Sequence, residues 1–339
     1  MTTRTLVRAV LRGSLRDIRH VRAVSPRRAQ DLTAAVYKRA EREFGVLAPP
    51  LALHSAAPLP LAASWLLLRE SLLVDGLVDR AVKEAVATEI SRQNACSYCV
   101  DVHRATLQTL PPVASGAPGA TAADWLRSDA ADGRRAPFTA EEAPEILAVA
   151  FTFHYLNRMV AVFLDDSPVP AQAPAAVRGP ILRTVARTMR PVDGPLAAGT
   201  SLGLLPDAPL PPPFSWAAPN PAVAGALARA AAAVDDAAGW VPDPVRDLLT
   251  AHLGAWDGTP PGIGRAWLRP ALARLAVTHR PTAALALLTA VAPHQVTADD
   301  IAAFRDHHPT DRALVELTSW ASLTTATALT SRLAGQPCP

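Results

Sequence analysis

Helical spacing of apolar residues runs through most of this 339-residue chain and limits its fold more than any other feature. Apolar side chains recur every three or four positions, as on one face of a helix, and several segments also have a capping residue or proline at the start and glycine after the end. The clearest segments are residues 30–45, 60–76, 77–93, 143–164, 243–256, 297–304 and 311–333. Alternating patterns of useful strand length are absent. The sequence therefore predicts an all-α fold.

Composition excludes several other classes of protein. Half of the residues are apolar and only 19% are charged, which is unlike a disordered chain or a coiled coil. Three cysteines in a chain of this length do not form the disulfide framework of a small secreted domain. The longest uncharged run, residues 51–68, contains His54, Pro58 and Pro60 and is a poor membrane span.

Positive charge is concentrated at the N-terminus. Residues 1–43 contain eleven Lys and Arg against four Asp and Glu, a net charge of +7, whereas the remaining residues sum to −4. We interpret residues 1–49 as a basic helical arm that lies on the body or on a neighbouring subunit; a nucleic-acid or membrane-surface arm is the alternative. The arm has no continuous apolar core of the kind that a signal peptide needs, so we expect a cytoplasmic protein without nucleic-acid or membrane partners.

A proline-rich stretch divides the chain. Residues 165–220 contain twelve prolines, and apart from a possible short helix near residues 181–190 we expect a stiff, extended linker. The flanking lobes, residues 50–164 and 221–335, share spaced residues: Arg69 corresponds to Arg229 at an offset of 160, and Lys83 to Arg246 at an offset of 163. We interpret the second lobe as a degenerate copy of the first.

The chemistry is expected in the first lobe, in the sequence NACSYCVDVH. Cys96, Cys99 and His103 have the spacing that places three side chains on one face of a helix. If Asn94 caps that helix, its first turn favours thiolate over thiol, so we expect a lowered pKa for the cysteine. Glu84, one helix upstream, can orient His103, which completes a relay able to deprotonate the thiol.

Other interpretations of this motif remain open. Buried structural cysteines are the simplest, although packing alone explains two thiols and an imidazole on one face poorly. A zinc site needs a fourth ligand, and the chain has no second Cys-x-x-Cys and no His-x-His. A thioredoxin-like motif needs a βαβ setting, which the helical periodicity does not provide. We therefore expect no metal and no cofactor.

The segment from Lys83 to His103 resembles the core motif of the alkylhydroperoxidase AhpD-like family, in the carboxymuconolactone decarboxylase superfamily. The resemblance rests on a glutamate, a serine, an asparagine, Cys-x-x-Cys and a histidine, which stand here as Glu84, Ser91, Asn94, Cys96, Cys99 and His103. It covers residues 60–110 and the helix near residues 153–159, about a quarter of the chain. It implies an all-helical fold, a homo-oligomer, and reduction of hydroperoxides by a disulfide cycle that a dithiol or protein reductant resets.

The resemblance also implies roles for individual residues. Cys99 would be the attacking thiolate, Cys96 the resolving thiol, His103 the base and Glu84 its orienter. This sequence departs from the family in having Ser97 and Tyr98 between the cysteines, where the best-known peroxidase has a histidine beside the second cysteine. The alternatives are a non-catalytic or redox-sensing helical scaffold and, within the superfamily, a lactone decarboxylase, which does not depend on a cysteine pair.

Further polar residues are candidates for a substrate pocket, with less support. The pocket candidates are Tyr98, Asn94, His154, Asn157, Arg158 and His54. For the cluster between His154 and Arg158 we favour a role in bracing the fold, and for His54 a solvated loop position. We expect Glu70 and Glu89 on solvated helix faces, and Cys338 in a free terminal tail.

Overall fold

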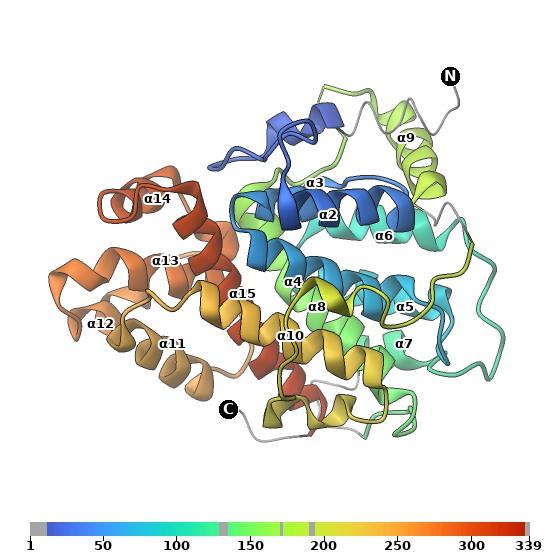
Figure 1. Ribbon diagram of the computed structural model, residues 1–339. Helices are drawn as coiled ribbons and strands as arrows, with labels where there is room; N and C mark the ends of the chain where they lie inside the picture. The colour runs from blue at the N-terminus through green and yellow to red at the C-terminus, as the bar shows by residue number, and fades with distance from the viewer. Residues whose placement is uncertain (1–11, 129–134, 170–171, 190–193, 336–339) are drawn as a thin grey trace.

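Helices form all of the regular structure in the part of the chain that the computed structural model describes, residues 12–128, 135–169, 172–189 and 194–335. The absence of strands in these ranges confirms the predicted all-α fold. The labelled helices are α2 (Asp31–Arg39), α3 (Pro49–Ala52), α4 (Pro58–Leu68), α5 (Arg80–Gln93), α6 (Ser97–Leu107), α7 (Ala122–Ser128), α8 (Ala143–Phe163), α9 (Ala175–Thr188), α10 (Pro221–Ala237), α11 (Asp243–Ala255), α12 (Leu268–Ala273), α13 (Arg280–Val291), α14 (Ala298–Arg305) and α15 (Asp311–Leu333) (Figure 1).

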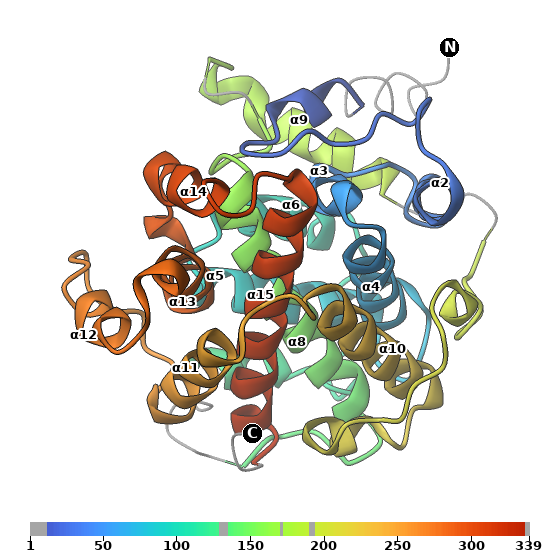
Figure 2. The same cartoon turned by 60° about the vertical axis from the view of Figure 1, so that its left-hand side comes forward.

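Helix α8 lies at the centre of the molecule. Its residues are apolar almost all round, and such a helix is stable only when other elements surround it. It packs against α4, α5, α13 and α15, and α15 crosses the middle of the molecule beside it (Figure 2). By length and composition α8 could cross a bilayer, but 94% of its most apolar window is buried inside the fold. Its hydrophobicity is therefore that of a core helix.

The two halves of the chain share one hydrophobic core. Helix α10 packs along α4 and α15 along α8, so the two longest helices of the second half lie directly on helices of the first. Buried residues from Leu15 to Ala328 form a single continuous cluster.

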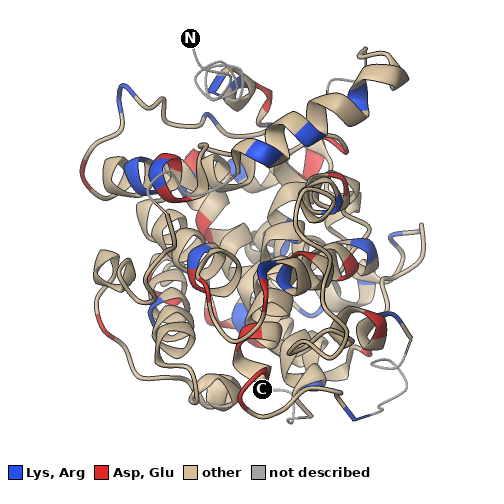
Figure 3. Ribbon diagram, turned by 90° about the vertical axis from the view of Figure 1, so that its right-hand side faces the viewer, with Lys and Arg blue, Asp and Glu red and all other residues tan. Residues whose placement is uncertain are grey.

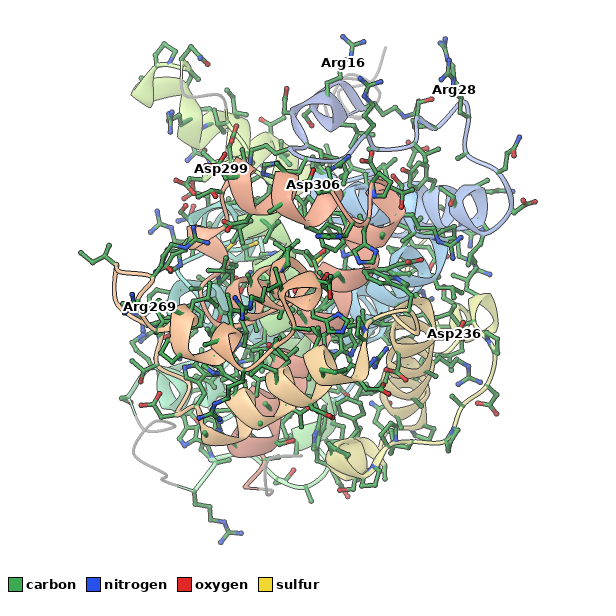
Figure 4. All side chains as sticks on the ribbon, turned by 90° about the vertical axis from the view of Figure 1, so that its left-hand side faces the viewer. Arg16, Arg28, Asp236, Arg269, Asp299 and Asp306 are labelled. Carbon is green, nitrogen blue, oxygen red and sulfur yellow. The ribbon has the colours of Figure 1, made fainter. Side chains whose placement is uncertain are left out.

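The N-terminal segment lies on this body as a strap. Leu15, Ile18 and Val21 are buried, and the backbone N–H of Arg19 donates to the carbonyl of Phe163 over 2.8 Å. The arm is not one continuous helix: the backbone becomes extended at Ile18, and helical structure returns within the arm at α2. Arg16 and Arg28 extend from this segment at the surface (Figure 4).

The proline-rich stretch contains helix α9, which packs against α6. Apolar residues of α9 face the body, whereas Arg183 and Arg187 are exposed and contribute to a basic outer face (Figure 3). The chain between the halves is therefore more than a spacer, because it covers the helix that carries the cysteine motif.

Two local signals at helix ends act as the sequence predicts. Thr297 and Asp300 form a capping box at the start of α14, in which the Thr297 N–H donates to the Asp300 carboxylate over 2.8 Å. Gly45 ends the turn after α2 with φ 90°, a conformation that side chains other than glycine rarely adopt.

Candidate active site

The cysteine motif lies at a sharp junction between α5 and α6. Asn94 is the C-cap of α5, Ala95 reverses the chain with φ 52°, and Cys96 is the N-cap of α6. The expectation that Asn94 caps the cysteine helix is therefore wrong. The helix begins two residues later because the turn at Ala95 lies between them, and this places Cys99 in the first turn of α6.

Both thiols are buried and reduced, with exposed fractions of 5% for Cys96 and 4% for Cys99. Hydrogen bonding to the Cys96 thiol, together with burial, raises the pKa of Cys99 well above its ordinary value, and a hydrogen bond from Asn157 acts in the opposite direction. The expected lowering of the cysteine pKa is therefore wrong. Helix-start dipoles favour a thiolate, but here the adjoining thiol and the loss of solvent outweigh them.

His103 and Glu84 are in direct contact. The Nδ1 atom of His103 lies 2.7 Å from the Oε2 atom of Glu84, which comes from the neighbouring helix α5. Burial would raise the pKa of Glu84, but the guanidinium of Arg80 and the His103 ring hold it below its ordinary value. The carboxylate is thus ionised and fixes the orientation of the imidazole, whose ring also meets the edge of Phe153.

An apolar cavity of about 80 Å³ opens over Cys99 and His103. Its walls come from the segment after α2, from α4, α6 and α8, and from α9, which closes the outer side. Tyr98 also lines the cavity, and burial raises its pKa, so the phenol keeps its proton. Cys96 is not among the lining residues, so Cys99 is the sulfur that this cavity presents to a molecule entering it.

The candidates Asn94, His154, Asn157 and Arg158 lie elsewhere. All four line a second, more polar cavity of about 150 Å³, separate from the apolar one. Asn94 donates to Asn157 over 2.9 Å, and Asn157 donates to Ser91 over 3.1 Å. These amides hydrogen-bond to each other next to the junction of α5 and α6, and Asn157 also hydrogen-bonds to the Cys99 thiol.

The expected surroundings of three further residues are wrong. His54 is fully buried, stacked on Tyr155 and bonded to the Leu51 carbonyl, so it is not solvated and lines neither cavity. Glu70 and Glu89 are each only 3% exposed, because Arg69 pairs with the first and Arg92 and Arg127 with the second. Cys338 lies outside the described residues.

Sequence reasoning missed two parts of the site. The outer wall of the apolar cavity comes from α9 and includes Ile181, Val185 and Met189. The sequence did not predict this wall, because the prolines of that stretch indicated an extended linker. Arg80 is bonded to Glu84 over 2.6 Å, and its position four residues before Glu84 on one helix face would have revealed it. No cluster of three or more His, Cys, Asp or Glu side chains suited to a metal ion occurs in the part of the chain described here.

Comparison with known proteins yields one curated relative along nearly the whole chain. It is a Mycobacterium tuberculosis protein named alkyl hydroperoxide reductase, 37% identical over 330 residues, which are 92% of this chain and 94% of the relative. No family model matches the chain. The similarity extends far beyond the cysteine motif and includes both halves.

Proposed function

The chain belongs to the alkylhydroperoxidase AhpD-like family, and from that premise we propose that it reduces organic hydroperoxides with the Cys96 and Cys99 thiols. The observation that carries the proposal is the placement of Cys99 and His103 on one apolar cavity, with Glu84 bonded to the far side of the imidazole. A nucleophile, a base and an orienting carboxylate are the groups that such a reaction needs.

The proposed cycle begins when His103 takes the proton of Cys99. The thiolate attacks the outer peroxide oxygen, the O–O bond breaks, and the alkoxide leaves as the alcohol with a proton from His103. Cys99 is then a sulfenic acid, and Cys96 attacks its sulfur to form a disulfide and release water. A dithiol or protein reductant returns two electrons and two protons and restores both thiols.

Because the thiol pair is buried, the proposed base, His103, has to remove the proton from Cys99. Because the pKa of Cys99 is raised, little thiolate exists before substrate enters, and deprotonation must accompany attack. Glu84 stabilises the imidazolium that results, since it is ionised and lies 2.7 Å from the ring nitrogen.

The lining of the cavity favours an alkyl substrate. Side chains such as Phe153, Leu156, Val185 and Met189 offer apolar contact area and few polar groups, so we propose an organic hydroperoxide over hydrogen peroxide. Function in the cytoplasm as a homo-oligomer is part of the same proposal. A redox-sensing scaffold would need the cysteines but would not turn over peroxide.

The test is turnover of an alkyl hydroperoxide with a panel of dithiol donors. Cys99→Ser should abolish turnover, whereas Cys96→Ser should allow one oxidation that stops at sulfenic acid. Retention of wild-type turnover by Cys99→Ser, or failure of the wild type to form the Cys96–Cys99 disulfide, would refute the peroxidase proposal in favour of the scaffold.

Glu84→Gln tests the relay separately. The rate should fall by roughly 10²- to 10⁴-fold, the range that a positioned acid–base group contributes. Glu141→Gln, which removes an exposed carboxylate from the surface before α8, is the matched control and should leave the rate unchanged. Equal rates for the two variants would remove Glu84 from the mechanism.

A further inference from the structure

The polar cavity behind the cysteine junction contains a buried charge. It lies between the junction of α5 and α6, the inner part of α8, and the loop at residues 256–260 after α11. Arg158 is on its lining and is only 5% exposed. The proposed peroxide chemistry gives this arginine no task.

Arg158 has no compensating negative group. Its Nε donates to the carbonyl of Ala290 and its Nη1 to the carbonyl of His154, each over 2.7 Å. No carboxylate lies within ion-pair distance of its guanidinium among the described residues, and burial lowers its pKa to about 9. Asp257, in the cavity's loop, accepts from the backbone N–H of Thr259 over 2.7 Å. A buried cation without an anion is costly and marks a place where one can bind.

The other walls indicate what kind of anion fits. His154 is uncharged, because burial and the nearby Arg158 lower its pKa well below the ordinary value. Trp256, Val291 and Leu329 supply apolar surface. One uncompensated positive charge beside apolar walls suits a single negative charge attached to a hydrocarbon group.

We propose that this cavity binds a small organic carboxylate, which pairs with Arg158 and rests its hydrocarbon part on Trp256. The carboxylate enters from the surface beside His294, which lines the cavity and is exposed to solvent. The site is distinct from the peroxide cavity over Cys99, and its occupation does not depend on turnover. Because Asn157 lines it and also bonds the Cys99 thiol, the site borders the redox pair.

The test is calorimetric titration of the full-length protein with benzoate at constant ionic strength. Benzamide has the same shape without the charge, and sulfate is an anion without the hydrocarbon group. Benzoate should bind saturably and at least about tenfold more tightly than either, and Arg158→Gln should lose that preference, as expected for a buried charged hydrogen bond. Equal binding of benzamide or sulfate, or no saturable binding of benzoate, would overturn the proposal.

A second pair of variants keeps the proposal testable if Arg158→Gln fails to fold, as judged by circular dichroism. His294→Glu adds a negative charge at the cavity surface, and His307→Glu adds the same charge at an exposed position after α14. Benzoate affinity should fall in the first and remain at the wild-type value in the second. Equal affinity in both variants would place benzoate outside this cavity.

Discussion

Three effects raise the pKa of Cys99. Hydrogen bonding to the Cys96 thiol is the largest, burial is the second, and the electrostatic interaction with Cys96 is the third. A change at Cys96 should therefore alter the pKa of Cys99. In most reactive cysteines the surroundings lower the pKa, whereas the mechanism proposed here assigns the deprotonation of Cys99 to the His103 imidazole.

Removing the Cys96 thiol should show how strongly it raises the pKa of Cys99. In Cys96→Ala the pKa of Cys99 should fall, so a larger fraction of Cys99 is thiolate at neutral pH. Thiolate ultraviolet absorbance, followed as pH is raised, measures this directly. For wild type the absorbance should rise only above the ordinary thiol range; a transition at or below about 8.5, the value of a free cysteine, would contradict the assignment.

Helix α9 shows how an element far along the chain completes a site. Ile181 lines the apolar cavity, while Val177, one turn earlier on α9, does not; both are 41% exposed. The two residues form a matched pair for testing whether α9 contacts the substrate.

Ile181→Asn should raise the KM for a long-chain alkyl hydroperoxide by about tenfold, because it replaces apolar lining with an amide. Val177→Asn should leave that KM unchanged, and neither variant should alter turnover of hydrogen peroxide. Steady-state kinetics with both peroxides provides the measurement. Equal KM changes in the two variants would show that α9 acts through stability and not through contact.

The turn between α4 and α5 depends on a close approach of backbone and carboxylate. A Cβ at Gly76 would clash with both carboxylate oxygens of Glu145. That carboxylate cannot easily move, since it is paired with Lys83 over 2.8 Å and accepts from Leu77 over the same distance.

Gly76→Ala should therefore lower the free energy of unfolding by about 1–3 kcal/mol, the usual cost of overpacking. Gly254→Ala is the control, because α11 leaves open space around that position and alanine is the better helix former. Chemical denaturation distinguishes the two variants. A stability loss in Gly254→Ala as large as that in Gly76→Ala would contradict the packing argument.

Most helices were predictable because their apolar residues keep a clear period. Helices α10 and α13 were not among the segments predicted from the sequence. The faces of α13 differ little because alanine and leucine occur all round it, whereas α10 has a distinct apolar face and was predictable. The contact between Glu84 and His103 was predictable, because Glu84 lies on the helix directly before the one that carries His103. The raised pKa of Cys99 was not, because it depends first on the hydrogen bond between the two thiols, which the turn at Ala95 positions, and second on burial, to which α9 and α4 contribute.

At the scale of the whole molecule, we propose that the two halves arose by duplication. Lys83 donates to the Val74 carbonyl before α5, and Arg246, its counterpart by spacing, donates to the Val241 carbonyl before α11. We expect residues 60–164 to superpose on residues 221–333 with at least three helices in the same order, and the loop at residues 256–262 to occupy the place of the cysteine motif. A different helix order would make the spacing an accident of composition.

Lowering the pH should destabilise the whole fold, because protons bind to its buried imidazoles more readily in the unfolded chain. Burial lowers the pKa of His54 from 6.5 to about 4, so the unfolded chain binds a proton there before the folded protein does. The stability that this gives is present above about pH 6.5 and is lost as pH falls toward 4, by up to about 3 kcal/mol.

Replacing His54 should remove that part of the pH dependence. In His54→Phe, the unfolding free energy should fall less between about pH 7 and pH 5 than in wild type. His307→Asn, at an exposed position, should keep the wild-type slope. Urea denaturation at several pH values measures the slopes, and an unchanged slope in His54→Phe would show that the imidazole is protonated in the folded protein.

The joining of both halves in one chain also sets the stoichiometry of the redox reaction. Helices α10 and α15 cover α4 and α8 as a second subunit would, yet they are encoded separately and carry no cysteine. Under the proposed mechanism each polypeptide therefore holds one reacting pair of thiols, Cys96 and Cys99. A substitution in either half occurs once per molecule and not at two mirrored places, and because the halves share one core, a change in the covering half also alters the packing of the half that carries the cysteines.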